Sequence, residues 1–325
     1  MKKVIAFGEA LIDMLSTSFS QDAGDEHEAF IKFPGGAPAN VAAAVGKLGG
    51  RSYFAGMVGK DMFGDFLVET LAASGVDTSC MLQTREAKTA LAFVSLDATG
   101  ERSFEFYRSP SADLLFREEH FDDAWFTEPG IFHFCSNTLT ESAIRETTLA
   151  GIAKAREAGF LISFDVNLRH NLWSDDEDAF AAVWQCIPQV DLLKLCVEEL
   201  EYLCAGQDED AVLNKMLEMG PSVILVTDGG KGVRYVSAYG QGSVVPPKVT
   251  MVDSTAAGDA FVGGLLYALA EQSVGPAELK SMAQEPTSLL PALRIACACG
   301  AYTVTQKGAI NSLPMLKDIQ ELLTK

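Results

Sequence analysis

The chain has 325 residues, 48% of them hydrophobic, which is enough for one large α/β domain with a substantial core. A formal net charge of −19 makes nucleic acids and anionic membranes unfavourable partners, so we expect neither. The apolar runs are too short to span a membrane, and the seven cysteines lack the spacing of a disulfide framework or a zinc site. These features predict a cytoplasmic protein.

Apolar runs alternate with amphipathic stretches along most of the chain. Strands are predicted at residues 4–7, 53–58, 131–134, 160–164, 192–195 and 222–226, and helices at 38–48, 61–74, 141–158, 176–186 and directly after 195. This alternation predicts a single domain over 1–325, with helices on both faces of a mainly parallel sheet. The polar stretch 273–288 is predicted to be a loop.

Two segments interrupt the alternation. Residues 15–33 are polar and irregular, and they end in a strand-like run at 29–33. Residues 89–108 read as two strands, 90–96 and 103–107, joined by a turn at 98–100. Because neither segment has a helix of its own, we expect them to form a small β-sheet that covers the main sheet as a lid.

The strongest local motif is DSTAAGDAFVGG at residues 253–264. Small residues at Ala256, Ala257 and Gly258 permit a tight turn into a helix, whose unpaired N–H groups form a site for the charge of a transferring phosphoryl group. Asp259 in the first helical turn is placed to accept a proton from an attacking hydroxyl, and we expect it to be ionised at neutral pH. An ordinary helix N-cap in a small-residue turn is the alternative interpretation.

A second motif, GGAPANVA, begins at Gly35 and Gly36. The paired glycines bring the backbone close to a ligand, and a helix follows in which Asn40 offers both a donor and an acceptor. The pattern suits a polyhydroxylated ligand, although a plain loop-to-helix transition produces it as well.

Polar residues also follow two predicted strands. Asp165, Asn167 and Arg169 come directly after 160–164, where ligands bind in doubly wound sheets; an internal salt bridge is the alternative. The run TDGGKG at 227–232 reads either as a nucleotide contact or as a hairpin turn. No Walker A motif and no dinucleotide-binding glycine fingerprint is present in the sequence.

Taken together and in this order, the motifs resemble those of the ribokinase-like, pfkB-type carbohydrate kinases, over residues 4 to about 314. Within that family the chain is most similar to bacterial fructokinases, through residues 35–40, 100–104, 108–113, 165–169 and 172–173. The resemblance implies an αβα sandwich with a β-lid, ATP as donor, Mg²⁺ as the bridging metal and activation by K⁺.

Site residues follow from the resemblance position by position. It implies Asp259 as the catalytic base and the backbone of 256–258 as the anion hole. It implies sugar contacts at Asp13, Gly35, Gly36 and Asn40, with Asp165, Asn167 and Arg169 near the sugar and the transferring phosphate. It implies nucleotide or Mg²⁺ contacts at Lys194, Glu199, Thr227, Gly229 and Gly232, and a monovalent-cation loop at Asp253, Thr255, Thr303, Gly308 and Ser312.

The sequence departs from the family pattern at two places. Ala256 stands where the anion hole usually has glycine, and an N–H donor survives that change. Cys196 and Val197 replace the usual Asn or Ser and Glu, which puts metal handling at Glu199 in doubt.

Several alternatives stay open. Aminoimidazole riboside, ribose and 2-keto-3-deoxygluconate compete with fructose as substrate, and Arg108 is a candidate cation for the sugar acid. A non-catalytic sugar-binding regulator is disfavoured because Asp259 and its small neighbours are intact. The predicted lid is also a candidate surface for a homodimer.

Overall fold

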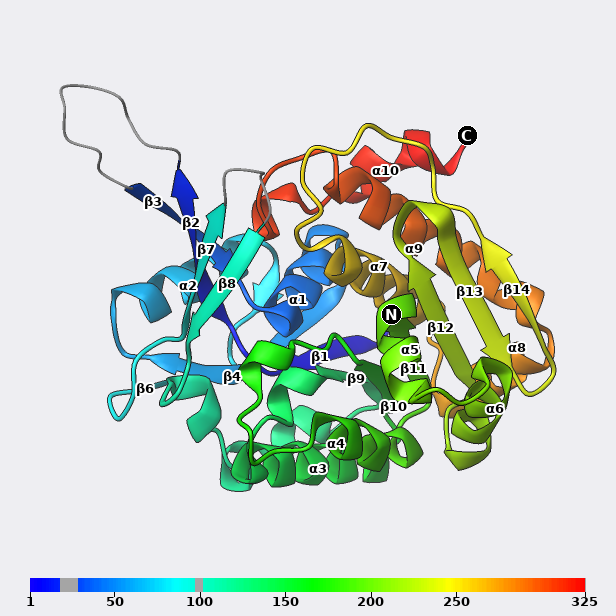
Figure 1. Ribbon diagram of the computed structural model, residues 1–325, viewed down its shortest axis with the longest axis horizontal. Helices are drawn as coiled ribbons and strands as arrows, with labels where there is room; N and C mark the ends of the chain where they lie inside the picture. Colours follow the sequence, from blue (N-terminus) through cyan, green and yellow to red (C-terminus); the bar gives the residue numbers. More distant parts are fainter. Residues whose placement is uncertain (18–28, 97–101, 325) are drawn as a thin grey trace.

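The computed structural model describes residues 1–17, 29–96 and 102–324, and two β-sheets organise it (Figure 1). The larger sheet has the strand order β14-β13-β12-β11-β10-β9-β1-β4-β5, with β6 also paired to β4. Its strands are β1 (Lys3–Phe7), β4 (Arg51–Gly59), β5 (Val76–Asp77), β6 (Met81–Thr84), β9 (Gly130–Cys135), β10 (Leu161–Asp165), β11 (Leu192–Cys196), β12 (Val223–Asp228), β13 (Gly232–Ser237) and β14 (Gly240–Val244). Within the described part of the chain, β12–β13 and β13–β14 are antiparallel and the other pairs of this sheet are parallel.

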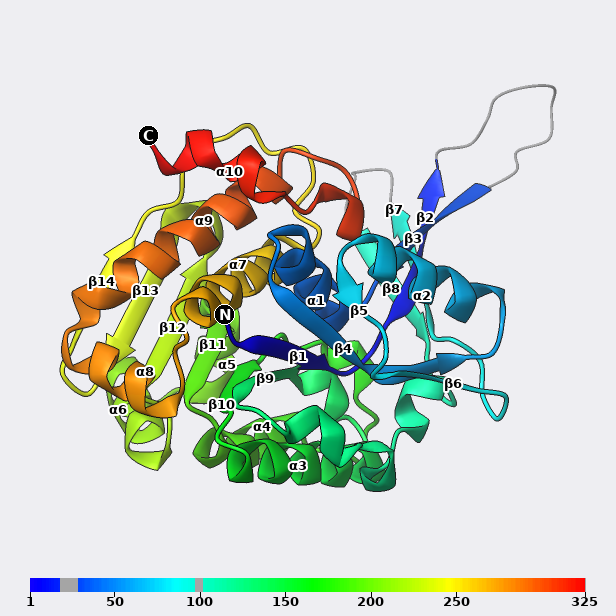
Figure 2. The ribbon, with the colours of Figure 1, turned by 180° about the vertical axis from the view of Figure 1, so that it is seen from behind.

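Helices cover both faces of the larger sheet (Figures 1 and 2). They are α1 (Ala37–Lys47), α2 (Met62–Ala73), α3 (Ser142–Glu157), α4 (Ala179–Cys186), α5 (Val197–Cys204), α6 (Glu209–Met219), α7 (Ala257–Glu271), α8 (Pro276–Gln284), α9 (Leu290–Thr303) and α10 (Leu316–Leu323). Helices α1, α2 and α7–α10 share one core, and α3–α6 share the other. Among the described residues, no helix combines the length and the apolar character that crossing a membrane requires.

Strand β1 shows why helices cover both faces of the larger sheet. Val4 and Ala6 belong to the core beneath α1 and α7, while Ile5 and Phe7 belong to the core above α3. All four side chains are at most 1% exposed. Successive strand residues point to opposite faces, so a continuous apolar run requires a layer of helices on each face. The predicted αβα sandwich is confirmed.

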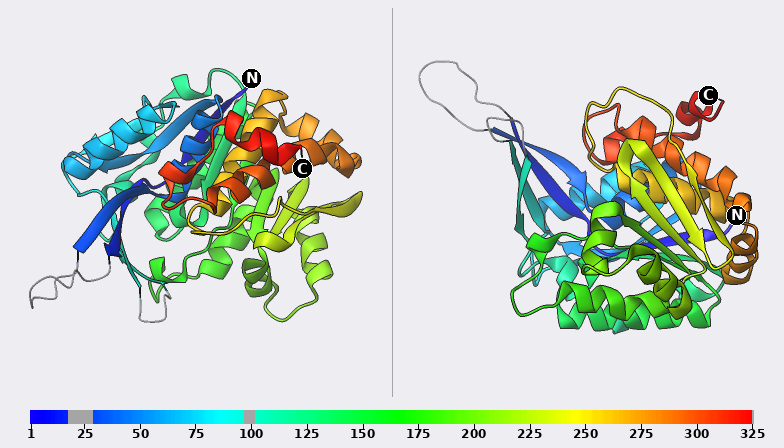
Figure 3. Two further views of the ribbon diagram at one scale, coloured as in Figure 1. Left: turned by 90° about the horizontal axis from the view of Figure 1, so that it is seen from above. Right: turned by 45° about the vertical axis from the view of Figure 1, so that its right-hand side comes forward.

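The smaller sheet stands off the main body (Figures 1 and 3). It has the order β3-β2-β7-β8, from β3 (Ala29–Gly35), β2 (Leu11–Thr17), β7 (Leu91–Leu96) and β8 (Arg102–Tyr107). We call these four strands the lid sheet. They confirm a second sheet built from the two predicted segments, whereas residues 18–28 and the predicted turn at 98–100 lie outside the described residues. The start of the lid is tied to the body by Asp61, the N-cap of α2, which accepts from Thr89 N at 3.0 Å.

Two expectations for local structure were wrong. Residues 11–17, partly read as irregular, form β2, which pairs with β3 and β7 and buries Leu11 and Ile12 at its start. The stretch 273–288 contains α8, which the Glu278 side chain caps by accepting from Gly275 N at 2.9 Å. The apolar face of α8 is narrow, and its polar surface made the segment look like a loop.

Candidate active site

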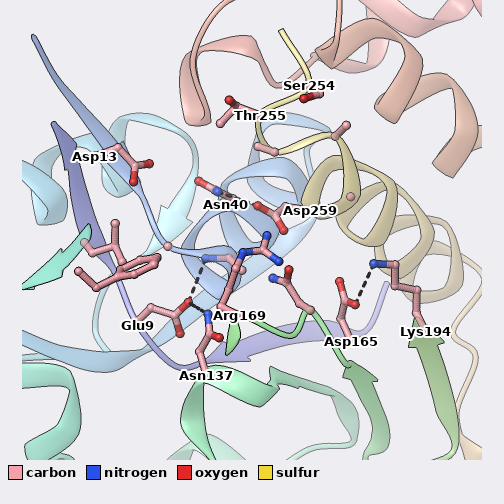
Figure 4. A pocket seen from close by; sticks show the side chains of 18 residues that line it. Glu9, Asp13, Asn40, Asn137, Asp165, Arg169, Lys194, Ser254, Thr255 and Asp259 are labelled. Atoms are coloured by element: carbon pink, nitrogen blue, oxygen red, sulfur yellow. Dashed lines mark hydrogen bonds and ion pairs between the residues drawn. The ribbon is translucent and has the colours of Figure 1, made fainter. Parts of the chain in front are cut away.

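A cavity of about 310 Å³ lies where the carboxyl ends of β1, β9, β10 and β11 meet the first turns of α1 and α7 (Figure 4). Loops after parallel strands converge at this edge of an α/β sheet, which is where such folds bind ligands. Most of the residues predicted for the site line the cavity: Asp13, Gly36, Asn40, Asp165, Asn167, Arg169, Lys194, Thr255, Ala256, Ala257, Gly258 and Asp259.

Asp259 lies in the first turn of α7, as predicted. Its Oδ2 accepts a hydrogen bond of 2.7 Å from Asn40 Nδ2. The carboxylate faces the cavity but sits deep in the molecule, and this burial raises its pKa, whereas the bond from Asn40 and the charges of Arg169 and Lys194 lower it. Its ionisation at neutral pH stays a prediction that depends on these three partners.

The turn before α7 is shaped for an anion. Ala256 adopts a left-handed conformation with φ 58°, which turns the chain sharply into the helix. The N–H of Ala257 donates to Ser254 O at 3.3 Å and that of Ala260 to Ala256 O at 2.8 Å. The N–H groups of Gly258 and Asp259 belong to the same first turn, at the cavity wall, where a helix N-terminus favours negative charge.

Glycines in α7 set the position of this turn. A Cβ at Gly263 would lie 2.4 Å from Ala44 Cβ of α1, and one at Gly264 would lie 2.7 Å from Cys299 Sγ of α9. Helix α7 therefore packs against both neighbours at a distance that only glycine permits. This close packing brings Asp259 within reach of Asn40 on α1.

Asp13 on β2 lies beside the paired glycines. A Cβ on Gly35 would come within 2.2 Å of Asp13 Oδ2, and a Cβ on Gly36, whose φ is 100°, within 2.5 Å of Glu9 O. The glycines thus let the loop fold tightly over residues 9–13. Burial, and next the nearby Asp259 charge, raise the pKa of Asp13 to about 7.

Asp165 and Lys194 form a buried ion pair across β10 and β11, with Nζ 2.9 Å from Oδ1. Burial raises the pKa of Asp165 to about 6, against the opposing effect of Lys194. For Lys194 burial alone would lower the pKa, but the charges of Asp165 and Glu199 outweigh it and raise the pKa. Both the predicted internal salt bridge and the predicted position at the cavity are therefore present.

Asn167 and Arg169 follow the same strand and line the cavity. Asn167 adopts a φ of 38°, a left-handed conformation that is uncommon for a residue other than glycine. Arg169 donates from Nη1 to Leu168 O at 3.1 Å. In Figure 4 the Arg169 side chain extends toward Asp259 and Asn40. A guanidinium there can bind an anion beside the proposed base.

The residues predicted to contact nucleotide lie further along the same edge. Thr227, the second-last residue of β12, pairs with Cys196 of β11. Gly229 and Gly232 belong to the β12–β13 hairpin, so the hairpin interpretation is confirmed. The Cβ positions of Gly229 and Gly230 face open space. Glu199 accepts from Cys196 N at 2.7 Å and from Leu168 N at 2.8 Å, so its carboxylate fixes two loops at this edge.

The loop predicted to bind a monovalent cation is assembled around Asp253. Its carboxylate accepts from Thr255 N at 2.8 Å and from Gly308 N at 3.1 Å, and its own N–H donates to Val304 O at 3.1 Å. Thr303 Oγ1 is buried without a hydrogen-bond partner in the described structure, and Ser312 Oγ donates to Ala309 O at 2.7 Å. The Asp253 carboxylate, Thr303 Oγ1 and Ser312 Oγ are oxygen atoms, the kind of ligand that a hard cation prefers.

Arg108 is not part of the cavity lining. Its Nε donates to Asp113 Oδ2 at 2.7 Å and its Nη2 to Asn137 O at 2.7 Å, and the residue is 5% exposed. The guanidinium therefore anchors the end of β8 to the body.

Six cavity residues were not predicted as site residues from the sequence, namely Glu9, Leu11, Ala37, Phe106, Asn137 and Ser254. Glu9 follows β1 and Asn137 follows β9, so the rule that polar residues after parallel strands meet at one edge would have found both. Phe106 comes from the lid sheet, and its contribution depends on the lid position. No sequence signal indicates that position.

A second cavity of about 870 Å³ lies at the β14 side of the sheet. Val244, Val245, Leu290 and Leu323 give it an apolar wall, and Arg294 and Cys297 of α9 also line it. Residues 249–256 run from its edge to the first turn of α7, so the two cavities share one connecting segment.

Comparisons with known proteins agree with this geometry. A family model described as pfkB family carbohydrate kinase matches residues 1–316. Probable fructokinase-7 of Arabidopsis thaliana is 41% identical over 324 residues, which cover 99% of this chain and 92% of that protein. The crystal structure of fructokinase from Xylella fastidiosa with bound ATP is 45% identical, with a TM-score of 0.94 over 99% of this chain and 98% of that one. A double-mutant fructokinase from Vibrio cholerae O395, in a form with bound fructose, ADP and potassium ion, is 35% identical, with a TM-score of 0.86 over 99% and 98%.

Proposed function

The chain belongs to the pfkB family of carbohydrate kinases, and on this premise we propose that it transfers the γ-phosphoryl group of ATP to a hydroxyl of D-fructose. The observation that carries the proposal is the Asp259 carboxylate, held by Asn40 at 2.7 Å in the first turn of α7. The adjoining cavity of about 310 Å³ has the size of a monosaccharide site. The identity to proteins named fructokinase supports the choice of sugar.

In this proposal the parts of the cavity on either side of Asp259 bind different substrates. Figure 4 places Asp13 and Glu9 on one side of Asp259, and Lys194 on the other. The sugar occupies the carboxylate side, where acceptors match its hydroxyl groups. The triphosphate approaches from the cationic side, near Lys194 and Arg169.

Asp259 acts as the general base of the transfer. A primary hydroxyl of fructose, at C1 or C6, donates its proton to the carboxylate as its oxygen attacks the γ-phosphorus. The bond from the γ-phosphorus to the β–γ bridging oxygen breaks, and ADP leaves with that oxygen. The first-turn N–H groups of α7 stabilise the charge on the transferring group. Asn40 keeps the carboxylate oriented through its Nδ2, while its Oδ1, buried without a partner among the described residues, is free to accept from the sugar.

Charge on the cavity wall favours a neutral sugar. Among the described residues that line it, Glu9, Asp13, Asp165 and Asp259 carry carboxyl groups, and Arg169 and Lys194 are the cations. The cation considered for a sugar acid, Arg108, is engaged with Asp113. A carboxylate substrate such as 2-keto-3-deoxygluconate would meet repulsion here. Ribose and aminoimidazole riboside are neutral, so they remain the competitors.

We place the adenine of ATP in the second cavity. Its apolar wall suits the face of a flat base, and segment 249–256 leads from it to the anion site. Thr227, Gly229 and Gly232 lie on the β12 side, between the two cavities in the order of the sheet. This arrangement lays the nucleotide along the carboxyl edge of the strands.

Mg²⁺ is the proposed companion of ATP, and when bound it neutralises charge on the β- and γ-phosphates. It keeps phosphate and water oxygens and takes few protein ligands, so a dedicated cluster of acidic residues is not required. Glu199 is the candidate to hold its water shell, because the carboxylate stands at the same edge as Lys194. Chelation with EDTA should then abolish turnover.

K⁺ is the proposed activator, bound at the loop of Asp253, Thr255, Thr303, Gly308 and Ser312. The support is the oxygen-rich geometry around Asp253 and the potassium-bound Vibrio cholerae protein. An ion there would order the segment that carries Ala256 and so stabilise the anion site.

We further propose a cytoplasmic homodimer built from single domains spanning 1–325. The seven cysteines are all unpaired, which fits a reducing compartment. On the lid sheet Phe106 lines the cavity, so the next residue, Tyr107, points to the outer face. There Phe93 contacts Phe30 and Tyr107 at ring distances of 5.3 and 5.2 Å, and Tyr107 is 59% exposed. An exposed aromatic cluster of this kind is a surface for a second copy.

A sugar screen tests the proposed function. ADP release is measured with ATP, Mg²⁺ and equal concentrations of D-fructose, ribose, aminoimidazole riboside and 2-keto-3-deoxygluconate. We expect the highest kcat/KM with fructose and the lowest with the sugar acid. A higher kcat/KM with another sugar would refute the substrate, and no sugar-dependent ADP release would refute the kinase.

A further inference from the structure

Glu9 is a buried acid to which the proposed reaction assigns no chemical step. It follows β1, is 2% exposed and contributes to the wall of the sugar cavity. Burial, which is the largest effect, raises the pKa of its carboxyl group. A buried carboxyl group is costly to keep unless its oxygens satisfy particular donors. The donors it satisfies indicate why it is there.

One oxygen of Glu9 holds two parts of the sugar site. Oε1 accepts from Asn137 Nδ2 at 2.8 Å and from Ala37 N at 3.2 Å. Ala37 is the first residue of α1 and directly follows Gly36, so this bond fixes the glycine loop and the start of the helix that carries Asn40. Two segments that are 100 residues apart in sequence, at 37 and 137, are joined by a single acceptor.

The bond from Asn137 also decides which way its amide faces. A carboxylate oxygen that accepts requires the NH₂ group of Asn137, so the carbonyl Oδ1 must turn away from Glu9. Asn137 lines the cavity, and its Oδ1 is buried without a partner in the described structure. The amide thereby presents an acceptor where a sugar hydroxyl can donate.

The hydrogen bonds that join Glu9 and Asn137 continue to the base of the lid sheet. The backbone oxygen of Asn137 accepts from Arg108 Nη2 at 2.7 Å, and Arg108 directly follows β8. Asp113 pairs with Arg108 at 2.7 Å, so the positive charge is already balanced without Glu9. Neutralising the Arg108 charge is therefore not what requires an acid at position 9.

We propose that Glu9 is a positioning residue, whose Oε1 sets the orientation of the Asn137 amide and the place of the Ala37 N–H so that both shape the sugar site. What it contributes is a hydrogen-bond acceptor rather than a negative charge. The inference rests on the proposed function, because it assigns Asn137 and the glycine loop to the sugar. Loss of the acceptor should weaken sugar binding and leave ATP binding intact.

Three variants separate the acceptor from the charge. Glu9→Ala removes the acceptor and should raise KM for the sugar on the order of tenfold, with KM for ATP within about twofold of wild type. Glu9→Gln keeps a carbonyl acceptor without the charge and should restore KM for the sugar to within about threefold. Cys135→Ala is the matched control, because Cys135 Sγ donates to the other oxygen, Oε2, at 4.0 Å; we expect its KM values to be unchanged.

A double-mutant cycle tests whether Glu9 affects sugar binding through Asn137. Asn137→Ala alone should raise KM for the sugar, and adding Glu9→Ala should then cost less than it does in the wild-type background. Additive effects would overturn the link through Asn137. Equal losses for Glu9→Gln and Glu9→Ala, or matching increases in KM for ATP, would show a structural or purely electrostatic role instead.

Hydrogen exchange on the ligand-free protein keeps this test separate from the proposed function. The Ala37 amide should exchange on the order of tenfold faster in Glu9→Ala than in wild type, and at the wild-type rate in Glu9→Gln. Unchanged exchange at Ala37 in Glu9→Ala would refute the positioning role, whichever sugar the wild-type enzyme accepts. A wild-type enzyme that phosphorylates no sugar would refute the proposed function, while the exchange result would still decide the role of Glu9.

Discussion

The catalytic turn, residues 256–259, and the lid sheet contribute to one cavity from very different surroundings. The turn opens α7, whose residues 260–270 are all buried between α1 and α9. The lid sheet stands off the body and exposes aromatic residues such as Tyr107 on its outer face. The comparison teaches that the proposed base, Asp259, is fixed by close packing, while Asp13 and Phe106, which line the proposed sugar site, come from the sheet with the least support.

This division predicts separable defects. Changes in the catalytic turn should lower kcat, and changes on the cavity face of the lid sheet should raise KM for the sugar. The following experiments can break or sharpen that separation.

Asp259→Asn should have the largest effect. The amide preserves the size of the side chain but cannot accept the hydroxyl proton at neutral pH, so kcat should fall by about 10²–10⁴-fold. Steady-state ADP release with the best sugar measures this. Turnover close to wild type would remove Asp259 from the role of base.

Asp13→Ala should affect sugar binding rather than the chemical step. Removing a carboxylate that accepts from sugar hydroxyls should raise KM for the sugar on the order of 10–100-fold, with KM for ATP little changed. A drop in kcat with an unchanged KM for the sugar would show that the lid sheet takes part in the chemistry.

When the pH is lowered, the first effect on the enzyme should come from protonation of Asp13. Since burial and the Asp259 charge raise the pKa of Asp13 to about 7, its carboxylate takes up a proton as the pH falls from 8 to 6. At one unit below the pKa only about a tenth stays ionised, so KM for the sugar at pH 6 should be about tenfold above that at pH 8. Because the pKa of Asp259 is also raised, kcat should fall as the pH falls. An Asp13→Asn variant that keeps the full change in KM would refute the assignment to Asp13.

Sugar binding should order the lid sheet more than the catalytic turn. The lid is expected to close over the bound sugar and exclude water, which limits wasteful hydrolysis of ATP. Amide exchange in the described lid strands should slow several-fold on addition of sugar, with a smaller change in α7. No protection in β2, β3, β7 or β8 would mean that this sheet is not a lid.

Ala256→Gly should have the smallest effect, and in the stabilising direction. The left-handed conformation of Ala256 destabilises the folded protein by about 1–2 kcal/mol, and glycine would remove this cost. Glycine also gives the unfolded chain more conformational freedom, which offsets about 0.4–1 kcal/mol of the gain. The free energy of unfolding should therefore rise by about 0.5–1 kcal/mol, with kcat within about twofold. A destabilised variant would show that the methyl group of Ala256 makes favourable contacts.

Much of the fold could be predicted because the main sheet is buried on both faces. Its strands are short apolar runs between helices, as at Val4–Phe7, and that pattern survives without any tertiary information. The position of Asp259 in the first turn of a helix was equally predictable, because small residues before an acidic residue indicate a tight turn into a helix; its role as base stays a prediction.

The lid sheet and the supporting acid were harder to predict. Strand β2 has polar residues at 13, 16 and 17 without a regular alternation and packs on the body mainly at its start, so its apolar signal is weak. Glu9 looks like an ordinary polar residue after a strand, and its task becomes clear only through Asn137 and Ala37, which the fold brings from distant positions. Long-range hydrogen bonds of this kind leave no local pattern.

Sugar binding to Asp259→Asn tests the central claim most directly. Titration calorimetry with D-fructose separates the base from the binding site, because the variant keeps the carbonyl oxygen and the volume of the side chain. The account predicts a dissociation constant within about threefold of wild type, alongside the loss of turnover described above. Binding that weakens as much as turnover falls would contradict it, and would make Asp259 a structural N-terminal residue of α7.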